Sequence, residues 1–203
     1  MKRVELNKEN KRASLLKTSF ELFQKKGFTK TSISDIVKEA GMAKGTFYLY
    51  FKDKYDLRNQ LITKKSQQVI AKADRFVQEN PVEGFEEQLL AFVDYILNYL
   101  QKDRILFQFI SKNLNWGLFE NMLNESVEDQ PGFLMDRCLR SMEKEKIQCR
   151  DLKLMLFTIM EMVNGTAHSC VLEGRPVPME EYLPYLHESI RAIIHVYCSP
   201  AVG

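Results

Sequence analysis

Residues 31–57 read TSISDIVKEAGMAKGTFYLYFKDKYDL, and this stretch decides the fold of the front of the chain. Ser32 and Asp35 stand three positions apart, as in a capping box, so a helix is predicted to begin at Ile33. Apolar residues then recur at helical spacing up to Gly41, whose conformational freedom suits the end of a helix. The pattern predicts a short helix of about two turns.

A second short helix is predicted over residues 43–51, after a turn at Met42. Phe47 and Phe51 lie four positions apart and form its buried face, while the polar positions between them point outward. Ala43 stands at the N-cap without a side-chain oxygen, which costs this helix about 1 kcal/mol of stability. Two short helices joined through a glycine turn form a helix-turn-helix, a unit that reads the major groove of DNA.

The charge of the chain is divided unevenly along its length. The net charge is only +2, but residues 1–75 hold 18 Lys and Arg against 8 Asp and Glu, a net of +10. Residues 76–203 hold 11 against 19, a net of −8. An ordinary solvated surface also produces such an excess, but its coincidence with a helix-turn-helix favours contact with phosphates.

Length, cysteine spacing and hydropathy exclude several other classes. With 203 residues and 45% hydrophobic content, the chain is long enough for a packed core. The four cysteines are widely spaced without a C-x-x-C pair, so we expect reduced thiols and neither a metal site nor a disulfide framework. No signal peptide and no run of about 18 apolar residues is present, so a cytoplasmic protein without a membrane segment is expected.

The remaining apolar positions repeat at three and four rather than at two, which predicts an all-α fold. A first helix is expected to end at Gly27 and to bury a stripe made by Ala13, Leu16, Phe20 and Phe23.

Asp53 is expected to cap a long helix from Lys54 to about Glu79, with Phe76 facing inward. Sparse Gly and Pro residues separate further helices in the rear of the chain. These helices are predicted at about 85–100, 103–114, 133–145, 151–172 and 179–198. The total is about nine helices.

The stretch EAGMAKGTFYLYFKDKYDL, followed by a long connecting helix and a larger helical rear, resembles the TetR family of bacterial transcriptional regulators. The specific part of the resemblance covers about residues 10–58. It implies an N-terminal helix-turn-helix DNA-binding domain at 1–53 and a helical effector-binding and dimerisation domain at 54–203. It also implies a homodimer on a double-stranded DNA operator, a small-molecule effector, and no cofactor.

The resemblance places four residues of the recognition helix in the major groove, namely Lys44, Gly45, Thr46 and Tyr48. Lys44 suits guanine O6 and N7, Gly45 lets the backbone approach the bases, and Thr46 offers a methyl group to thymine. These positions are therefore the candidates for sequence specificity.

Four further residues match positions at which the family holds phosphates. Tyr50 and Lys54 flank the end of the recognition helix, and Thr31 and Ser32 stand at the amino end of the preceding helix. Phosphate contacts fix the register of a protein on DNA and carry no base specificity themselves.

The rear of the chain is rich in aromatic and methionine residues, which suit either an apolar cavity or an ordinary helical core. We predict an apolar or aromatic effector between the long helix and the rear helices. The candidate lining residues are Phe76, Phe92, Tyr95, Tyr99, Phe107, Trp116 and Phe157. The helices at 151–172 and 179–198 are the expected dimer interface.

The sequence favours a ligand-responsive repressor that a small apolar or aromatic effector releases from a palindromic operator. The alternative is a DNA-binding adaptor controlled by a protein partner, without a small-molecule effector. A buried cavity of several hundred Å³ in the rear domain favours the first, and a solid core with an exposed apolar patch besides the dimer face favours the second. An enzyme is not expected, because no nucleophile, base and orienting group stand at recognisable spacing.

Overall fold

The computed structural model describes residues 2–114, 117, 120 and 133–200. The chain forms two compact units, Met1–Lys64 (unit 1) and Lys65–Gly203 (unit 2). The described residues form nine helices and two short strands: α1 (Lys2–Lys26), α2 (Ile33–Glu39), α3 (Lys44–Tyr48), α4 (Lys54–Glu79), α5 (Phe85–Gln101), α6 (Arg104–Ser111), α8 (Phe133–Lys144), β1 (Ile147–Cys149), α9 (Leu152–Leu172), α10 (Met179–Tyr197) and β2 (Cys198–Pro200).

The all-α class is confirmed, and the helix boundaries agree with the predicted ones to within a few residues at most ends. The two compact units meet inside α4, whereas the sequence places the domain boundary at the start of that helix. The division into functional domains at 1–53 and 54–203 stays a prediction. Among the described residues, no helix combines the length and apolarity that a membrane span requires.

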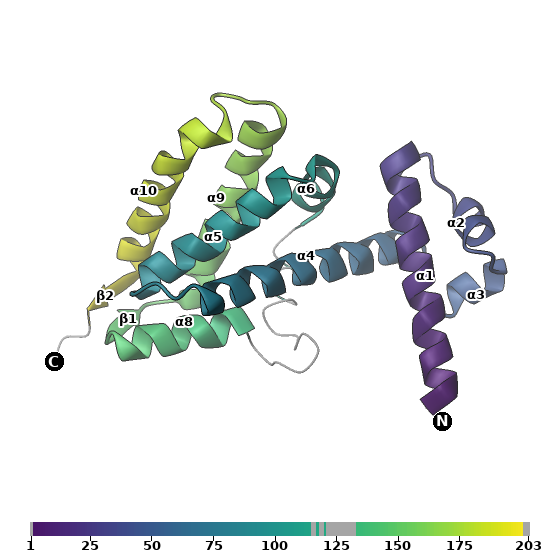
Figure 1. The fold of residues 1–203 in the computed structure, drawn as a ribbon, viewed down its shortest axis with the longest axis horizontal. Coiled ribbons are helices and arrows are strands. Elements are labelled where there is room, and N and C mark those ends of the chain that lie inside the picture. Colours follow the sequence, from purple (N-terminus) through teal and green to yellow (C-terminus); the bar gives the residue numbers. More distant parts are fainter. Residues whose placement is uncertain (1, 115–116, 118–119, 121–132, 201–203) are drawn as a thin grey trace. The chain divides into compact units, whose positions relative to one another are not determined.

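Unit 1 packs α2 and α3 beside the buried face of α1 (Figure 1). Leu15, Leu16, Leu22 and Phe23 form this face of α1. The predicted stripe is therefore right for Leu16 and Phe23, but wrong for Ala13, which is exposed. The reason is that α1 begins at Lys2 and its first turns extend beyond the core that α2 and α3 cover.

The start of α4 is fixed by Asp53, as predicted. Its Oδ1 accepts hydrogen bonds from the backbone N–H groups of Tyr55 and Asp56, both at 2.8 Å. These bonds satisfy two of the amides that a helix leaves unpaired at its amino end. The first turn of α4 is thus held firmly to the residue that follows the helix-turn-helix.

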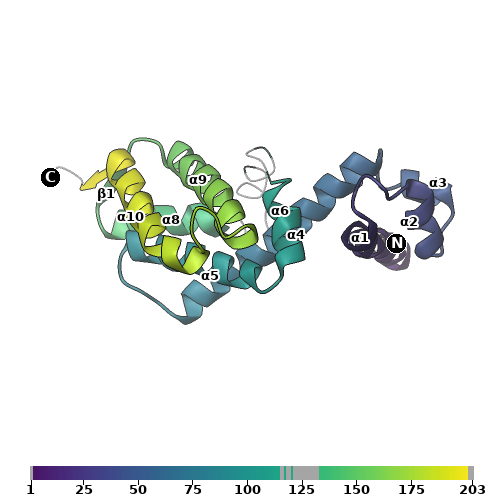
Figure 2. The same ribbon diagram turned by 90° about the horizontal axis from the view of Figure 1, so that it is seen from above.

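Unit 2 is a bundle in which α9 and α10 lie side by side and antiparallel (Figures 1 and 2). Polar contacts of Arg191 and His187 attach α10 to α5. Arg191 donates to Glu86 at 2.8 Å and to Glu87 at 2.7 Å, and His187 Nε2 lies 2.7 Å from Asp94 Oδ1. These contacts fix the outer pair of helices against the helix that lines much of the interior.

Two features of unit 2 differ from the sequence prediction. Phe76 is 38% exposed and the neighbouring Val77 faces the core instead, so the inward placement of Phe76 is wrong. The strands β1 and β2 pair antiparallel, with Cys149 opposite Cys198. Strands of three residues are too short to show a period of two, so the sequence pattern does not predict them.

Candidate nucleic-acid interface and candidate effector cavity

The capping box at the start of α2 is present in full. Ser32 Oγ accepts from the backbone N–H of Asp35 at 3.1 Å, and the backbone N–H of Ser32 donates to Asp35 Oδ2 at 2.9 Å. The backbone hydrogen bond, followed by the one from the Ser32 hydroxyl, lowers the pKa of Asp35 below its ordinary value. Gly41 then ends α2 with φ +65°, which sets the turn into α3.

Helix α3 buries one aromatic side chain and exposes most of its other positions. Phe47 is completely buried and its ring contacts that of Phe51, with 5.4 Å between the ring centroids. Lys44 and Gly45 are exposed, and Tyr48 is 53% exposed. The outward side of this helix, called the α3 surface below, consists of Lys44, Gly45, Thr46 and Tyr48.

The fold itself does not require the glycine at position 45. A Cβ at Gly45 would meet no atom within 4 Å. Glycine inside a helix is less favourable than alanine by about 0.5–1 kcal/mol. The missing side chain leaves the backbone of α3 open to close approach from outside the chain.

The structure places the candidate phosphate contacts in different surroundings. Ser32 is exposed at the amino end of α2, and Tyr50 is half-buried. Thr31 is buried, and its hydroxyl donates to the carbonyl oxygen of Gly27 at 2.8 Å. Ser32 is therefore the residue of the Thr31–Ser32 pair that reaches the surface.

Lys54 makes contacts within unit 1 that the sequence did not suggest. Its Nζ donates to the carbonyl oxygens of Phe28 and Thr31, each at 2.9 Å, and lies 4.4 Å from the centroid of the Phe28 ring. Cationic donors on carbonyl oxygens form strong hydrogen bonds. Lys54 thus joins the first turn of α4 to the connection between α1 and α2.

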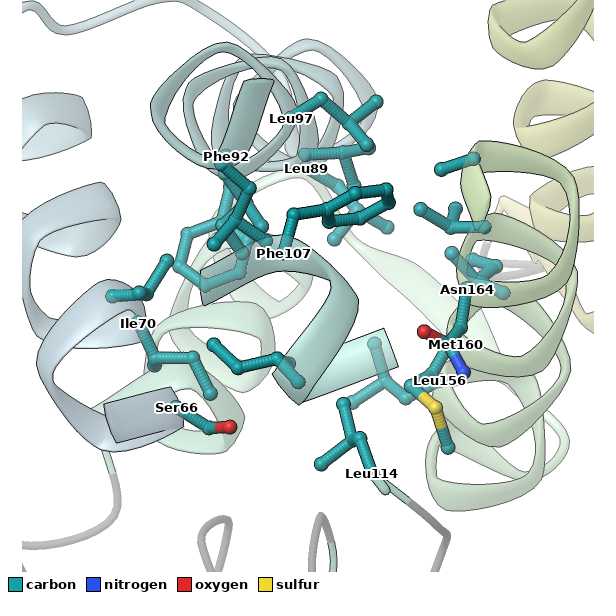
Figure 3. Close-up of a pocket in the computed structure, with 18 residues that line it drawn as sticks. Ser66, Ile70, Leu89, Phe92, Leu97, Phe107, Leu114, Leu156, Met160 and Asn164 are labelled. Atoms are coloured by element: carbon teal, nitrogen blue, oxygen red, sulfur yellow. The ribbon is translucent and has the colours of Figure 1, made fainter. Parts of the chain in front are cut away.

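An apolar cavity of about 130 Å³ lies inside unit 2, between α4, α5, α6 and α9 (Figure 3). None of the described lining residues is charged. They are Ser66, Val69, Ile70, Leu89, Phe92, Val93, Ile96, Leu97, Leu100, Phe107, Ile110, Leu114, Leu156, Ile159, Met160, Val163, Asn164 and Ala167.

Two lining residues are polar, and they come from opposite walls (Figure 3). Ser66 on α4 is 4% exposed, and its buried Oγ has no hydrogen-bond partner among the residues that the structure describes. Asn164 on α9 donates through Nδ2 to the carbonyl oxygen of Ser111 at 3.2 Å. A buried hydroxyl without a partner is energetically unfavourable, so Ser66 is suited to receive one from a bound molecule.

The aromatic residues predicted to line the cavity have different positions in the structure. Phe92 and Phe107 line it. Phe76, Tyr95 and Tyr99 form a row of rings elsewhere in unit 2, with neighbouring centroids 4.9 and 6.2 Å apart. Phe157 borders a separate surface hollow with Glu120 and Lys153, and Trp116 lies outside the described residues.

The outer face of α9 and α10 exposes apolar side chains at helical spacing. Leu154 is 47% exposed, Tyr185 63% and Val196 67%. Ile190 and Ile194 of α10, by contrast, are buried within the chain. Their burial attaches α10 to unit 2, while the exposed positions remain available to a partner.

Unit 1 exposes α3, the second helix of a helix-turn-helix, and unit 2 is a larger helical unit with a cavity. This arrangement is typical of two-domain helix-turn-helix regulators. Residues 15–61 match the family model of bacterial regulatory proteins, tetR family. This part of the chain therefore carries the helix-turn-helix domain of that family.

The likeness to individual proteins is strongest at the front of the chain. An uncharacterized HTH-type transcriptional regulator, YdgC of Bacillus subtilis, is 32% identical over 97 residues, which cover 47% of this chain and 50% of YdgC. The chain thus matches half the length of this relative.

Solved structures resemble the chain over nearly its whole length. The fatty acid degradation regulator FadR from Bacillus halodurans has a TM-score of 0.61 and 20% identity, covering 88% of this chain and 96% of FadR. A protein from Shewanella sp. PV-4 assigned to the tetR family has a TM-score of 0.64 and 17% identity, covering 93% and 98%. At these identities the likeness establishes the fold.

Sequence reasoning missed the two polar lining residues, although one of them leaves a signal. Ile62, Ser66, Val69 and Ala73 follow one buried stripe of α4, in which Ser66 is the single polar member. A lone hydroxyl in an apolar stripe marks either an internal hydrogen bond or a cavity. Asn164 leaves no comparable signal, because α9 alternates polar and apolar residues around it.

Proposed function

We propose that this protein is a dimeric transcriptional repressor that binds a palindromic operator through the α3 surface. A small, uncharged, mainly apolar effector enters the cavity of unit 2 and weakens operator binding. The observation that carries the proposal is the apolar cavity beside α4, the helix that continues directly from the helix-turn-helix. Its volume of about 130 Å³ is smaller than the several hundred Å³ expected, so the proposed effector is correspondingly small.

The α3 surface has the chemistry that reading of base edges requires. Lys44 supplies a cationic donor for guanine, and Tyr48 supplies a hydroxyl and a ring. Gly45 supports this assignment, because the fold has no need of a glycine there and a close approach to bases does. The basic excess of the front of the chain adds affinity for phosphates that is independent of sequence.

The outer face of α9 and α10 is the proposed dimer interface. A twofold axis beside this face would bury Leu154, Tyr185 and Val196 of both copies in a four-helix arrangement. Two heads in one dimer then read two half-sites about 34–36 Å apart, which is one turn of DNA.

The effector acts through α4. Ser66, Val69 and Ile70 on this helix form one wall of the cavity, so a bound molecule presses directly against α4. A small tilt of α4 changes the spacing of the two recognition helices. A coupling of only about 1–3 kcal/mol changes operator affinity about 5- to 150-fold.

The cavity restricts the size and charge of the effector. A volume of about 130 Å³ is close to that of a known cavity of roughly 150 Å³ that holds benzene, so a single ring or a short alkyl chain fits. The apolar lining strongly disfavours an ionised group. Two similar proteins are named for fatty-acid metabolism, which agrees with an alkyl effector.

DNA reading is tested with an operator selected by the wild-type protein from random DNA. In gel-shift titrations, Lys44→Ala and Tyr48→Ala should each reduce discrimination at particular base pairs, by about 1–3 kcal/mol where a bidentate contact is lost. Lys38→Ala, an exposed change on α2, is the matched control. Unchanged operator preference in both α3 variants would reject the α3 surface as the reading element.

The effector class is tested with three probes that share one ring: cyclohexanol, cyclohexylamine and cyclohexanecarboxylate. Calorimetry on the full chain should show binding of the neutral alcohol and no binding of either ion at neutral pH. Ser66→Ala should weaken alcohol binding about 2- to 13-fold, since a neutral hydrogen bond contributes about 0.5–1.5 kcal/mol. Cyclohexanol that binds without changing operator affinity would instead favour control by a protein partner.

A further inference from the structure

Three of the four cysteines gather at one end of unit 2, although they are far apart in the sequence. Cys138 lies on α8, Cys149 on β1 and Cys198 on β2. Cys198 Sγ also lies 3.5 Å from Met155 Sδ. Burial, and then the neighbouring thiols of Cys149 and Cys138, raise the pKa of Cys198 to about 12.

The strand pairing places Cys149 and Cys198 directly opposite each other. The next pair along the ribbon is hydrogen-bonded, because Arg150 N–H donates to the carbonyl oxygen of Tyr197 at 2.8 Å. The N–H of Cys198 donates instead to the carbonyl oxygen of Ile194 within α10. Cys149 and Cys198 therefore form a non-hydrogen-bonded pair.

Non-hydrogen-bonded pairs bring side chains closest in an antiparallel ribbon. Their Cα atoms lie about 4.5 Å apart, with both side chains on the same face. A disulfide spans Cα separations of about 4.4–6.8 Å. The ribbon thus presents two thiols at a separation that a disulfide can join without moving either strand.

We propose that Cys149 and Cys198 form a reversible oxidation site, at which a peroxide converts the two thiols into a disulfide. This inference goes beyond the proposed function and does not depend on DNA binding or on an effector.

The two cysteines have different parts in the reaction. Cys149 is half-exposed and meets the peroxide first, whereas Cys198 is buried and its raised pKa keeps it a thiol at neutral pH. The Cys149 thiolate attacks the peroxide ROOH, giving a sulfenic acid after proton transfer and releasing ROH. The Cys198 sulfur then attacks the sulfenic sulfur, and the S–O bond breaks as the S–S bond forms. The proton of the Cys198 thiol passes to the departing hydroxyl group, which leaves as water. Two thiols lose two electrons, and the peroxide gains them.

The disulfide would connect the two helices of the proposed dimer face. Strand β1 precedes α9 by two residues and β2 follows α10 directly. A covalent link between the strands fixes the amino end of α9 to the carboxyl end of α10. It also restricts the unfolded chain, so the oxidised protein should unfold at a higher temperature than the reduced protein.

The site is tested on the full-length, reduced protein with hydrogen peroxide as the oxidant. After brief oxidation and alkylation of free thiols, peptide mapping by mass spectrometry should find Cys149 joined to Cys198 within one chain. Dithiothreitol should reverse the link. Cys149→Ser and Cys198→Ser should each abolish it, and Cys170→Ser, a buried thiol on α9 outside the cluster, should leave it intact.

The wild-type peptide map decides the pairing even if the Cys198 variant folds poorly. A link between Cys138 and Cys198 would overturn the assignment, as would a link between two chains. Irreversible oxidation of Cys149 to a sulfinic acid without any disulfide would also overturn it.

Discussion

The α3 surface of unit 1 is exposed and built within one helix of five residues, whereas the cavity of unit 2 is buried and built from residues between Ser66 and Ala167. The first surface carries a cation and two hydroxyls; the second is lined almost wholly by hydrocarbon. An exposed surface can change its specificity with little effect on folding, since surface substitutions alter stability by about 0.5 kcal/mol or less. A cavity cannot do so as easily, because most of its lining side chains also belong to the core.

A variant that unfolds unit 1 alone tests most directly whether the two units fold and bind their ligands separately. Phe47→Ala removes a completely buried ring and should cost about 3–5 kcal/mol of the stability of unit 1. Operator binding should be lost, while calorimetry should still detect cyclohexanol in unit 2. Leu49→Ala is the control, because this neighbouring apolar side chain lies outside the α3 surface, is 79% exposed and contributes less to packing. Loss of cyclohexanol binding in Phe47→Ala would show that the two units do not fold separately.

The cavity is tested by filling it. Ala167 is buried and lines the cavity, so Ala167→Leu places a larger side chain in the effector volume. Cyclohexanol affinity should fall at least tenfold, or about 1.4 kcal/mol, with operator affinity unchanged in the absence of effector. Overpacking in Ala167→Leu should cost no more than about 1–3 kcal/mol of stability. Thermal unfolding of the variant measures this loss.

Ala71→Leu on α4 is the matched control, because Ala71 does not line the cavity. Equal loss of cyclohexanol binding in both variants would mean that the molecule binds elsewhere.

The two regions also differ in how far the sequence could predict them. The helix-turn-helix was predictable because its signals are local: the Ser32–Asp35 box and Gly41 act within a few residues, and the structure contains both. The all-α class followed equally from helical periodicity. The stripe of α1 was partly wrong, because the sequence does not show how far α2 and α3 cover that helix.

The interior of unit 2 depends on contacts between distant residues. Phe92 and Phe107 were correctly predicted to line the cavity, but Tyr95 and Tyr99 do not, although all four have similar apolar surroundings in sequence. Periodicity shows that a residue is buried, and it does not show whether the facing helix leaves a space. The pairing of Cys149 with Cys198 likewise depends on a ribbon whose strands are too short to predict.

Lys54 tests whether a half-buried cation at the start of α4 contacts DNA or positions the helix-turn-helix. We expect Lys54→Ala to lower the stability of unit 1 by about 1–3 kcal/mol, because two carbonyl oxygens lose a charged donor. Operator affinity should fall equally for all sequences, with the salt dependence unchanged. Lys52→Ala, at an exposed neighbouring position, is the control. If the slope of log operator affinity against log salt concentration is smaller by about one in Lys54→Ala but unchanged in Lys52→Ala, Lys54 instead contacts a phosphate.

The smallest expected effect concerns the capping box of α2. Ser32→Ala removes the acceptor for the Asp35 N–H and should cost about 1 kcal/mol, with Ser34→Ala as the exposed control. The pKa of Asp35 is lower in the folded state than in the unfolded state. The ionised carboxylate therefore stabilises unit 1 above the unfolded pKa, and this stabilisation is lost as the pH falls through the folded pKa. In wild type the stability of unit 1 should therefore decrease below about pH 4. Ser32→Ala should show a weaker decrease and an Asp35 pKa closer to the ordinary value, which NMR titration of the carboxyl measures. An Asp35 pKa unchanged by Ser32→Ala would mean that the backbone N–H of residue 32 and the lysines near α2, and not the Ser32 hydroxyl, hold this carboxyl ionised.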